Sequence, residues 1–277
     1  MTSIDTWQAV LLGTVEGLTE FLPVSSTAHL KLTESLLGLP VGDDAVVAYT
    51  ALIQTGAIAA VLVYFVRDLA TLTVAGLRGL VHAPTRSTEE FRLAWWIVLA
   101  TIPLAAVGIL AKPLIEGPLA SLWVVAASLV LGSLYMAAAD RRAARAPRRD
   151  DVGVRDALLI GSSQILALLL PGFSRSGASI STGLLLGLDR VRATRLSFLF
   201  SVPALTGAGL YELKDAAGAG AAGPLLLGIA VAFAVSLASI AWLLRFVARH
   251  SFSAFIGYRL ALAVVVVVAL AVGALAA

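Results

Sequence analysis

Two carboxylates lie close together near the start of the chain, in the stretch EGLTEFLPVSSTAH of residues 16–29. Glu16 and Glu20 are four residues apart, so they share one face of a helix. Both stand in an apolar segment, where two carboxylates repel each other and resist desolvation unless a metal ion, a proton or another cation is near. The pair is therefore a candidate divalent-cation site, and both residues are candidate catalytic groups.

A run of hydroxyl side chains follows the two carboxylates. Pro23 lacks an N–H and clashes with the preceding turn, so we expect the first helix to end near it. Ser25, Ser26 and Thr27 then lie in a loop, and the helix that starts there has an N-terminus that favours anions. His29 comes three residues after Ser26, close enough for a proton relay if the loop turns back.

A second polar cluster, PGFSRSGAS, covers residues 171–179 in the other half of the chain. Arg175 stands in the middle of an apolar segment, and its planar guanidinium suits bidentate recognition of a phosphate. The neighbouring Ser174, Ser176 and Ser179 offer further donors to the same anion. Together, the two clusters predict phosphoryl chemistry with an anion clamp, a nucleophile and a divalent cation. The paired glutamates alone are also compatible with proton or cation transport.

The composition indicates what surrounds these residues. The 277-residue chain is 59% apolar and only 13% charged, whereas soluble domains are about 45–50% apolar and about 25% charged. This excludes an ordinary soluble enzyme, a disordered chain and a nucleic-acid binder. The net charge of +3 is better explained by arginines placed by membrane topology. Cysteine is absent, which excludes disulfides, thiolate metal sites and a cysteine nucleophile.

The sequence predicts one all-α integral membrane domain over residues 1–277. Six apolar stretches are long enough to cross a bilayer, and they lie near residues 45–66, 93–111, 119–139, 196–213, 225–247 and 257–276. The segments 6–34 and 156–188 are also apolar, but Pro, Gly and polar residues interrupt them. Such backbone is tolerated at membrane depth only inside protein or along a cavity. We therefore expect two re-entrant helix–loop–helix segments in addition to six transmembrane helices.

Arginines set the expected orientation, because cytoplasmic loops collect Lys and Arg. If the connections 67–92, 140–155, 190–195 and 245–259 all face the cytoplasm, every arginine except Arg175 lies on that side. Both termini then lie outside the cytoplasm. The first broken segment enters the membrane from outside and the second from inside.

The two broken segments also match each other at an offset of 148 residues. The matched pairs are Gly13 with Gly161, Glu16 with Gln164, Pro23 with Pro171, and Ser26 with Ser174. Three spans follow each segment, so the halves 1–139 and 156–277 must have opposite orientations, with 140–155 as a basic cytoplasmic linker. Inverted repeats of this kind place their sites where the halves meet. Gln164, the counterpart of Glu16, is a candidate substrate-binding residue.

Residues 13–30, GTVEGLTEFLPVSSTAHL, and 171–183, PGFSRSGASISTG, resemble the two signature regions of the undecaprenyl-diphosphate phosphatase family. These integral-membrane phosphatases are linked with bacitracin resistance. The resemblance covers the whole chain in length, span order and motif position. It implies hydrolysis of undecaprenyl pyrophosphate to undecaprenyl phosphate, the lipid carrier of cell-wall synthesis. It also implies a divalent cation such as Mg²⁺ or Ca²⁺, a bacterial plasma-membrane location and an active site that opens to the outer face.

The resemblance also assigns residues to roles. The family's acidic motif falls on Glu16 and Glu20. Its serine–threonine–histidine motif falls on Ser25, Ser26, Thr27 and His29, and its arginine motif falls on Ser174, Arg175 and Ser176. In the expected reaction Ser26 attacks the terminal phosphorus, and His29 or a glutamate takes its proton. A metal-activated water is the alternative nucleophile. The sequence departs from the family's motifs at two positions. It has Ala28 where the family usually has Gly, and Ser179 where the family usually has Thr, and both bear on the geometry of the loops.

An alternative function is transport or flipping of a polyprenyl phosphate lipid, because an inverted repeat with a polar midplane cavity also suits a transporter. Phosphate release from a polyprenyl pyrophosphate would distinguish the two functions. The expected partners are the lipid pyrophosphate and membrane lipids, without nucleic acid. Small residues throughout 216–241 favour close helix packing or a homodimer face.

Overall fold

The structure is a computed structural model that describes residues 4–145, 149, 151–212 and 221–275, and these residues form helices without any strand. In chain order the elements are α1 (Thr6–Thr19), α2 (Ser26–Leu36), α3 (Asp44–Tyr64), α4 (Val66–Val81), η1 (Ala83–Ser87), α5 (Glu89–Leu110), α6 (Lys112–Glu116), η2 (Pro118–Ala120), α7 (Leu122–Ala143), α8 (Val154–Ser162), α9 (Gln164–Leu169), α10 (Arg175–Leu185), α11 (Arg190–Glu212), α12 (Ala222–Val247) and α13 (Ser253–Ala271). The all-α prediction is confirmed.

Among the described residues, five helices are long and apolar enough to cross a membrane, namely α3, α5, α7, α12 and α13. They coincide with five of the six predicted spans to within a few residues at most ends. The sixth predicted span, 196–213, lies in α11, which is not among the five. Three arginines, Arg190, Arg192 and Arg195, stand in the first turns of α11.

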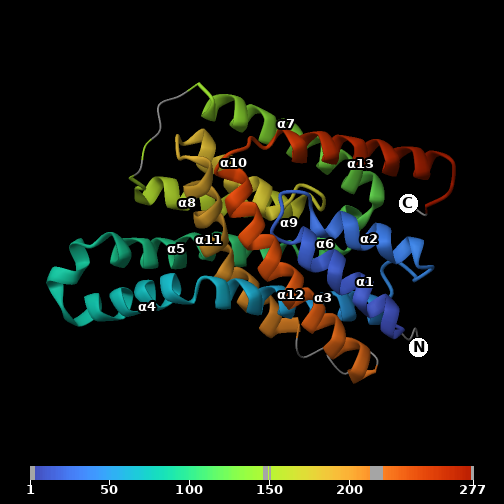
Figure 1. Cartoon of the computed structure of the whole chain (residues 1–277), viewed down its shortest axis with the longest axis horizontal. Coiled ribbons are helices and arrows are strands. Elements are labelled where there is room, and N and C mark those ends of the chain that lie inside the picture. The colour runs from blue at the N-terminus through green and yellow to red at the C-terminus, as the bar shows by residue number, and fades with distance from the viewer. Residues whose placement is uncertain (1–3, 146–148, 150, 213–220, 276–277) are drawn as a thin grey trace.

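The connection predicted at 67–92 is itself helical. It contains α4 and η1, and α4 packs against α5 to form a helical hairpin that extends to one end of the molecule (Figure 1). Two ion pairs tie this hairpin to the start of α11, Arg195 with Asp68 at 2.8 Å and Arg192 with Glu89 at 2.6 Å. These ion pairs place the start of α11 beside the hairpin; the side of the membrane on which they lie stays a prediction.

Small residues let α12 pack closely against α1 and α3, beside which it runs in Figure 1. A methyl group on Gly13 would meet the carbonyl oxygen of Gly228 at 2.5 Å, and one on Gly17 would meet that of Ala232 at 2.7 Å. The described part of the predicted 216–241 stretch thus serves helix packing within the chain; residues 216–220 lie outside the described residues.

The two predicted broken segments have the same backbone where α2 and α10 begin. Ser25 and Ser174 are their N-cap residues, with φ of 78° and 75°, a left-handed conformation that is uncommon for a residue other than glycine. Each helix has 11 residues and is followed by a positive-φ glycine, Gly38 or Gly187. Ser174 therefore corresponds to Ser25 and not to Ser26, because the second segment holds one more residue before its helix.

In Figure 1, α1 and α2 lie toward the end of the molecule that carries both termini, and α9 and α10 lie nearer its middle. The Ser176 hydroxyl of α10 bonds to the carbonyl oxygen of Leu22, which follows α1. The start of α1 and the end of α13 lie at the same end of the molecule in both figures. The loops that join α1 to α2 and α9 to α10 thus face each other from different halves of the chain.

Candidate active site

Glu20 joins the two predicted clusters. It is the C-cap residue of α1, and its side chain is buried, with 4% of it exposed. One carboxylate oxygen, Oε2, accepts a hydrogen bond of 2.7 Å from the Ser26 hydroxyl, and the other, Oε1, is bound by Nη2 of Arg175 in an ion pair. Ser26 is the first residue of α2 and Arg175 the first residue of α10. The predicted meeting of the two loops is therefore observed, with a carboxylate at its centre.

A second bond joins the loops through the backbone. The Ser176 hydroxyl donates to the carbonyl oxygen of Leu22 at 3.1 Å and lies 3.1 Å from the Ser174 hydroxyl. The Ser174 hydroxyl also accepts from the N–H of Gly177 at 3.1 Å, which caps α10. Ser174 and Ser176 are both buried, so these two predicted substrate-binding residues shape the loop contact in this structure.

Arg259 corrects the topology argument, which had placed it in a cytoplasmic loop. It lies on α13 and is fully buried. Its guanidinium donates to the carbonyl oxygen of Pro23 at 3.3 Å in one loop, and to those of Gly172 and Phe173 at 3.0 and 3.1 Å in the other. It also donates to Leu129 O and Ser133 Oγ of α7. An arginine can serve so many acceptors because its five N–H donors are fixed in a fork.

Gly132 of α7 makes this arrangement sterically feasible. A methyl group at this position would collide with Nη2 of Arg259 and would approach the Phe173 carbonyl oxygen to 2.7 Å. Sequence reasoning missed both residues as parts of the site. Arg259 precedes the most apolar part of the last span and looked like a membrane-flanking residue, whereas its burial depends on how α7 and α13 pack.

His29 is held by a partner other than the one expected. Its Nδ1 lies 2.7 Å from the Ser25 carbonyl oxygen, to which it must donate, so Nε2 accepts from the Tyr258 hydroxyl at 2.6 Å. The two rings also stack, with centroids 5.6 Å apart. The proton of Ser26 points to Glu20 instead of His29.

The remaining predicted residues are divided between the site and its support. Thr27 is exposed beside Ser26, and Glu16 is fully buried one turn before Glu20. Ser179 bonds to Arg175 O at 2.9 Å and to the Ser197 hydroxyl of α11 at 2.6 Å. Gln164 accepts from the Ser201 hydroxyl, also of α11, at 3.1 Å. Ser179 and Gln164 therefore fasten the second half to α11 and do not reach the Glu20 carboxylate.

The carboxylate oxygens of Glu16 and Glu20 are donors of the kind that a hard divalent cation with few protein ligands would need. No group of three or more His, Cys, Asp or Glu side chains suited to a metal occurs in the described part of the chain. Glu16 and Glu20 supply carboxylate oxygens one turn apart on α1. Mg²⁺ is often bound by one or two carboxylates with substrate phosphates and water completing the shell. The two glutamates match that kind of site.

Replacing Arg259 with lysine is expected to lower the rate of phosphate release from a polyprenyl pyrophosphate, the reaction that the sequence resemblance implies, by about 10–10² fold. A single ammonium group cannot hold both loops, and each lost charged hydrogen bond is worth about 1.5–3 kcal/mol. The thermal unfolding midpoint should fall as well. Since the chain has no cysteine, spin labels on Thr27→Cys and Leu170→Cys can report the spacing of the loops. Arg245→Lys, an exposed arginine on α12, is the control. Unchanged spacing with unchanged turnover would contradict the role given to Arg259.

Several known proteins are similar to this chain over nearly its full length. The family described as "Bacitracin resistance protein BacA" matches residues 9–265. Undecaprenyl-diphosphatase 1 of Streptomyces coelicolor and that of Frankia alni are each 59% identical over 276 residues, which is 99% of both chains in each pair. The undecaprenyl-diphosphatase of Cutibacterium acnes is 45% identical over 269 residues, 94% of this chain and 95% of that protein. Matches of this extent show that the chain belongs to the bacitracin resistance protein BacA family.

Proposed function

We propose that the protein hydrolyses undecaprenyl diphosphate to undecaprenyl phosphate and inorganic phosphate, and so recycles the lipid carrier of cell-wall synthesis and confers bacitracin resistance. The observation that carries the proposal is the contact of one carboxylate, Glu20, with both the hydroxyl of Ser26 and the guanidinium of Arg175. The names of the full-length relatives support the substrate.

The proposed membrane arrangement has α3, α5, α7, α11, α12 and α13 as six spans of the bacterial plasma membrane. The segments α1–α2 and α8–α10 are then re-entrant and enter from opposite sides, which makes the halves an inverted repeat. The shared start of α2 and α10 supports this symmetry. The active site opens to the outer face, and both termini lie on that face. A homodimer stays a prediction.

The phosphate groups of the substrate are held by positive charge from both halves. Arg175 is a quarter exposed, so its guanidinium can bind a phosphate while one nitrogen stays on Glu20. The N-termini of α2 and α10 add backbone N–H groups, with Thr27 exposed at the first of them. The lipid tail stays in the bilayer against the apolar helix surfaces.

In the first chemical step the Ser26 oxygen attacks the terminal phosphorus, and its proton passes to Glu20. The bond between this phosphorus and the bridging oxygen breaks, and undecaprenyl phosphate leaves with the electron pair. Glu20 suits the role of base because its Oε2 already accepts the Ser26 proton at 2.7 Å. Arg175 stabilises the charge that develops on the phosphoryl oxygens.

In the second step water attacks the phosphoserine, the bond from phosphorus to the Ser26 oxygen breaks, and phosphate leaves. Before this step Glu20 passes the first proton to the departing undecaprenyl phosphate; the carboxylate then takes a proton from the attacking water and returns it to the serine oxygen. His29 stands one helical turn from Ser26, is oriented by Tyr258, and is the second candidate acceptor. A divalent cation held by Glu16 and Glu20 would neutralise charge on the phosphates.

The proposal is tested by phosphate release from undecaprenyl diphosphate, using the protein purified in detergent. We expect release that stops on addition of a chelator and returns with Mg²⁺ or Ca²⁺. Release unaffected by the chelator would contradict the cation site while leaving the phosphatase intact. An absence of release in every condition would overturn the phosphatase and would favour transport of the lipid.

A further inference from the structure

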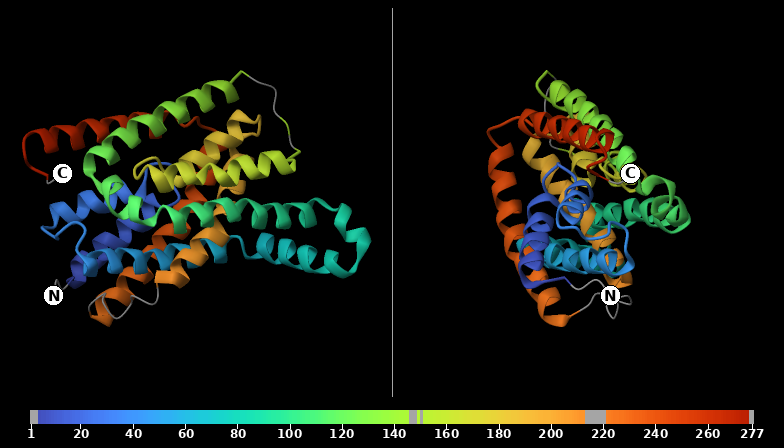
Figure 2. Two further views of the ribbon diagram at one scale, coloured as in Figure 1. Left: turned by 180° about the vertical axis from the view of Figure 1, so that it is seen from behind. Right: turned by 90° about the vertical axis from the view of Figure 1, so that its right-hand side faces the viewer.

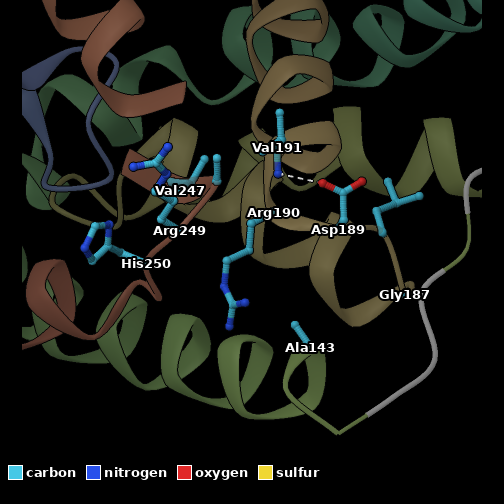
Figure 3. A pocket seen from close by; sticks show the side chains of 10 residues that line it. Ala143, Gly187, Asp189, Arg190, Val191, Val247, Arg249 and His250 are labelled. Atoms are coloured by element: carbon cyan, nitrogen blue, oxygen red, sulfur yellow. Dashed lines mark hydrogen bonds between the residues drawn. The ribbon is translucent and has the colours of Figure 1, made fainter. Parts of the chain in front are cut away.

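A hollow of about 260 Å³ lies where the ends of three helices meet, away from Glu20 and Ser26. It is lined by Ala143 at the end of α7, by residues 187–191 at the start of α11, and by residues 247–250 at the end of α12. Figure 3 shows Arg190 in the first turn of α11, with its side chain directed toward Ala143, and Arg249 and His250 in the segment that follows the end of α12. We call it the α7–α11–α12 hollow.

The cations of this hollow are only partly compensated. Arg190 is held by the Asp140 carboxylate, at 2.9 Å from Nε and 2.6 Å from Nη2. Arg249 is exposed, and it takes part in none of the ion pairs of the described residues. The His250 ring stacks on Phe246, and its Nδ1 donates to the Phe246 carbonyl at 3.1 Å, which turns this nitrogen away from any ligand.

The one carboxylate in the lining is already engaged. Asp189 accepts from the backbone N–H groups of Val191 and Arg192 at 2.9 and 3.1 Å, so its charge is directed at the first turn of α11 (Figure 3). It therefore offsets little of the positive charge that Arg249 brings to the other side of the hollow. Because Asp140 already pairs with Arg190, the cation that a ligand in the hollow meets without an ion-pair partner among the described residues is Arg249.

A neighbouring hollow repeats this chemistry. It measures about 360 Å³ and is lined by Ala138, Arg141, Arg142 and Arg145, which lie on one face of the last turns of α7. None of its three arginines is in an ion pair within the described part of the chain. Two concave, arginine-lined sites thus flank the end of a single membrane span.

Both hollows are separate from the active site. Helix α10 begins at Arg175 and ends at Leu185, and Gly187 of the α7–α11–α12 hollow follows that end. Eleven helical residues span roughly 15 Å at about 1.5 Å each. The hollow and Arg175 are therefore at opposite ends of one short helix.

We propose that the α7–α11–α12 hollow binds a phosphate group, carried by the head group of an anionic lipid or present as free phosphate. Arg249 and Arg190 supply charged donors, which bind phosphate in fixed geometry. Basic pockets between membrane helices are suited to anionic head groups, and the ends of three helices place this one where a head group can reach it. The neighbouring arginines of α7 extend the same positive surface.

Binding of dihexanoyl phosphatidylglycerol to the purified full-length protein tests the proposal by calorimetry. All proteins carry Arg175→Gln, so that the active site contributes little to phosphate binding. We expect Arg249→Gln to weaken binding about tenfold, in keeping with the loss of one charged hydrogen bond. Arg78→Gln, which removes one exposed arginine of α4, should change the affinity less than twofold. The thermal unfolding midpoints show whether each variant is folded.

Two further ligands identify the source of the phosphate. Competition by inorganic phosphate would mean that the phosphate group alone is recognised, and its failure would assign the site to the lipid head group. Either result supports the proposal if it depends on Arg249. The proposal is overturned if the parent protein does not bind the lipid, or if Arg249→Gln binds it with unchanged affinity. It is also overturned if Arg78→Gln weakens binding equally, or if dihexanoyl phosphatidylcholine binds equally well.

Discussion

Substitution of Ser26 by alanine is expected to lower turnover of undecaprenyl diphosphate by about 10⁴-fold or more, the scale seen when a serine nucleophile is removed from other hydrolases. The substitution removes one hydroxyl at the start of α2 and leaves the N-cap residue Ser25 in place. The measurement is phosphate release at saturating substrate. Ser35→Ala, near the end of the same helix, should keep full activity.

A covalent intermediate gives this prediction a second readout. Rapid acid quenching of the parent protein with labelled substrate should reveal phosphate on Ser26 by mass spectrometry. If Ser26→Ala retains near-normal turnover, the nucleophile is water and the serine only positions the phosphate. A large loss without any detectable phosphoserine would also favour water, with Ser26 as a binding group.

Substitution of Glu20 by glutamine is expected to lower kcat by about 10³-fold, within the range typical of general-base catalysis. The amide oxygen can still accept from Arg175, but the amide cannot take the proton of Ser26 and has only one oxygen for the two partners. Phosphate release across a range of cation concentrations separates this loss from weaker metal binding. Glu90→Gln at the exposed start of α5 is the matched control.

The outcome with His29 decides which residue is the base. If Glu20→Gln remains active while His29→Gln loses activity to the same degree, then His29 accepts the proton and Glu20 only orients Ser26. If high cation concentration restores Glu20→Gln, the carboxylate acts mainly as a metal ligand. The 2.7 Å bond from Ser26 to Glu20 favours loss of activity that added cation does not restore.

The central residues of the site could be found from sequence because their types are unusual in apolar segments. Glu20 and Arg175 are charged groups with no reason to be there unless they meet a partner or a ligand, and they do meet each other. Arg259 gave no such signal, because an arginine near the start of a span is normal. Its burial follows from the space left by Gly132 and from loop carbonyls, which only the folded chain brings together.

The positions of the helices could be predicted where a long apolar run alone identifies a membrane span. The five candidate spans stand at five of the predicted positions. The helical nature of α4 was missed, since its arginines indicated a connection and say nothing about backbone conformation. The sequence match paired Ser26 with Ser174 at an offset of 148 residues. The backbone instead pairs Ser174 with Ser25, which has the same positive φ, so the offset from this position on is one residue larger.

The placement of Arg259 on the final helix has a consequence for biosynthesis. A growing chain releases the first loop into the membrane long before α13 leaves the ribosome, and Glu20 precedes Arg175 by 155 positions. Until α10 follows, Glu20 lacks the guanidinium of Arg175, and until α13 follows, the loop carbonyls lack the donors of Arg259. The active centre is thus complete only after α13 has been made and packed, and a chain that stops before α13 should carry no working phosphatase.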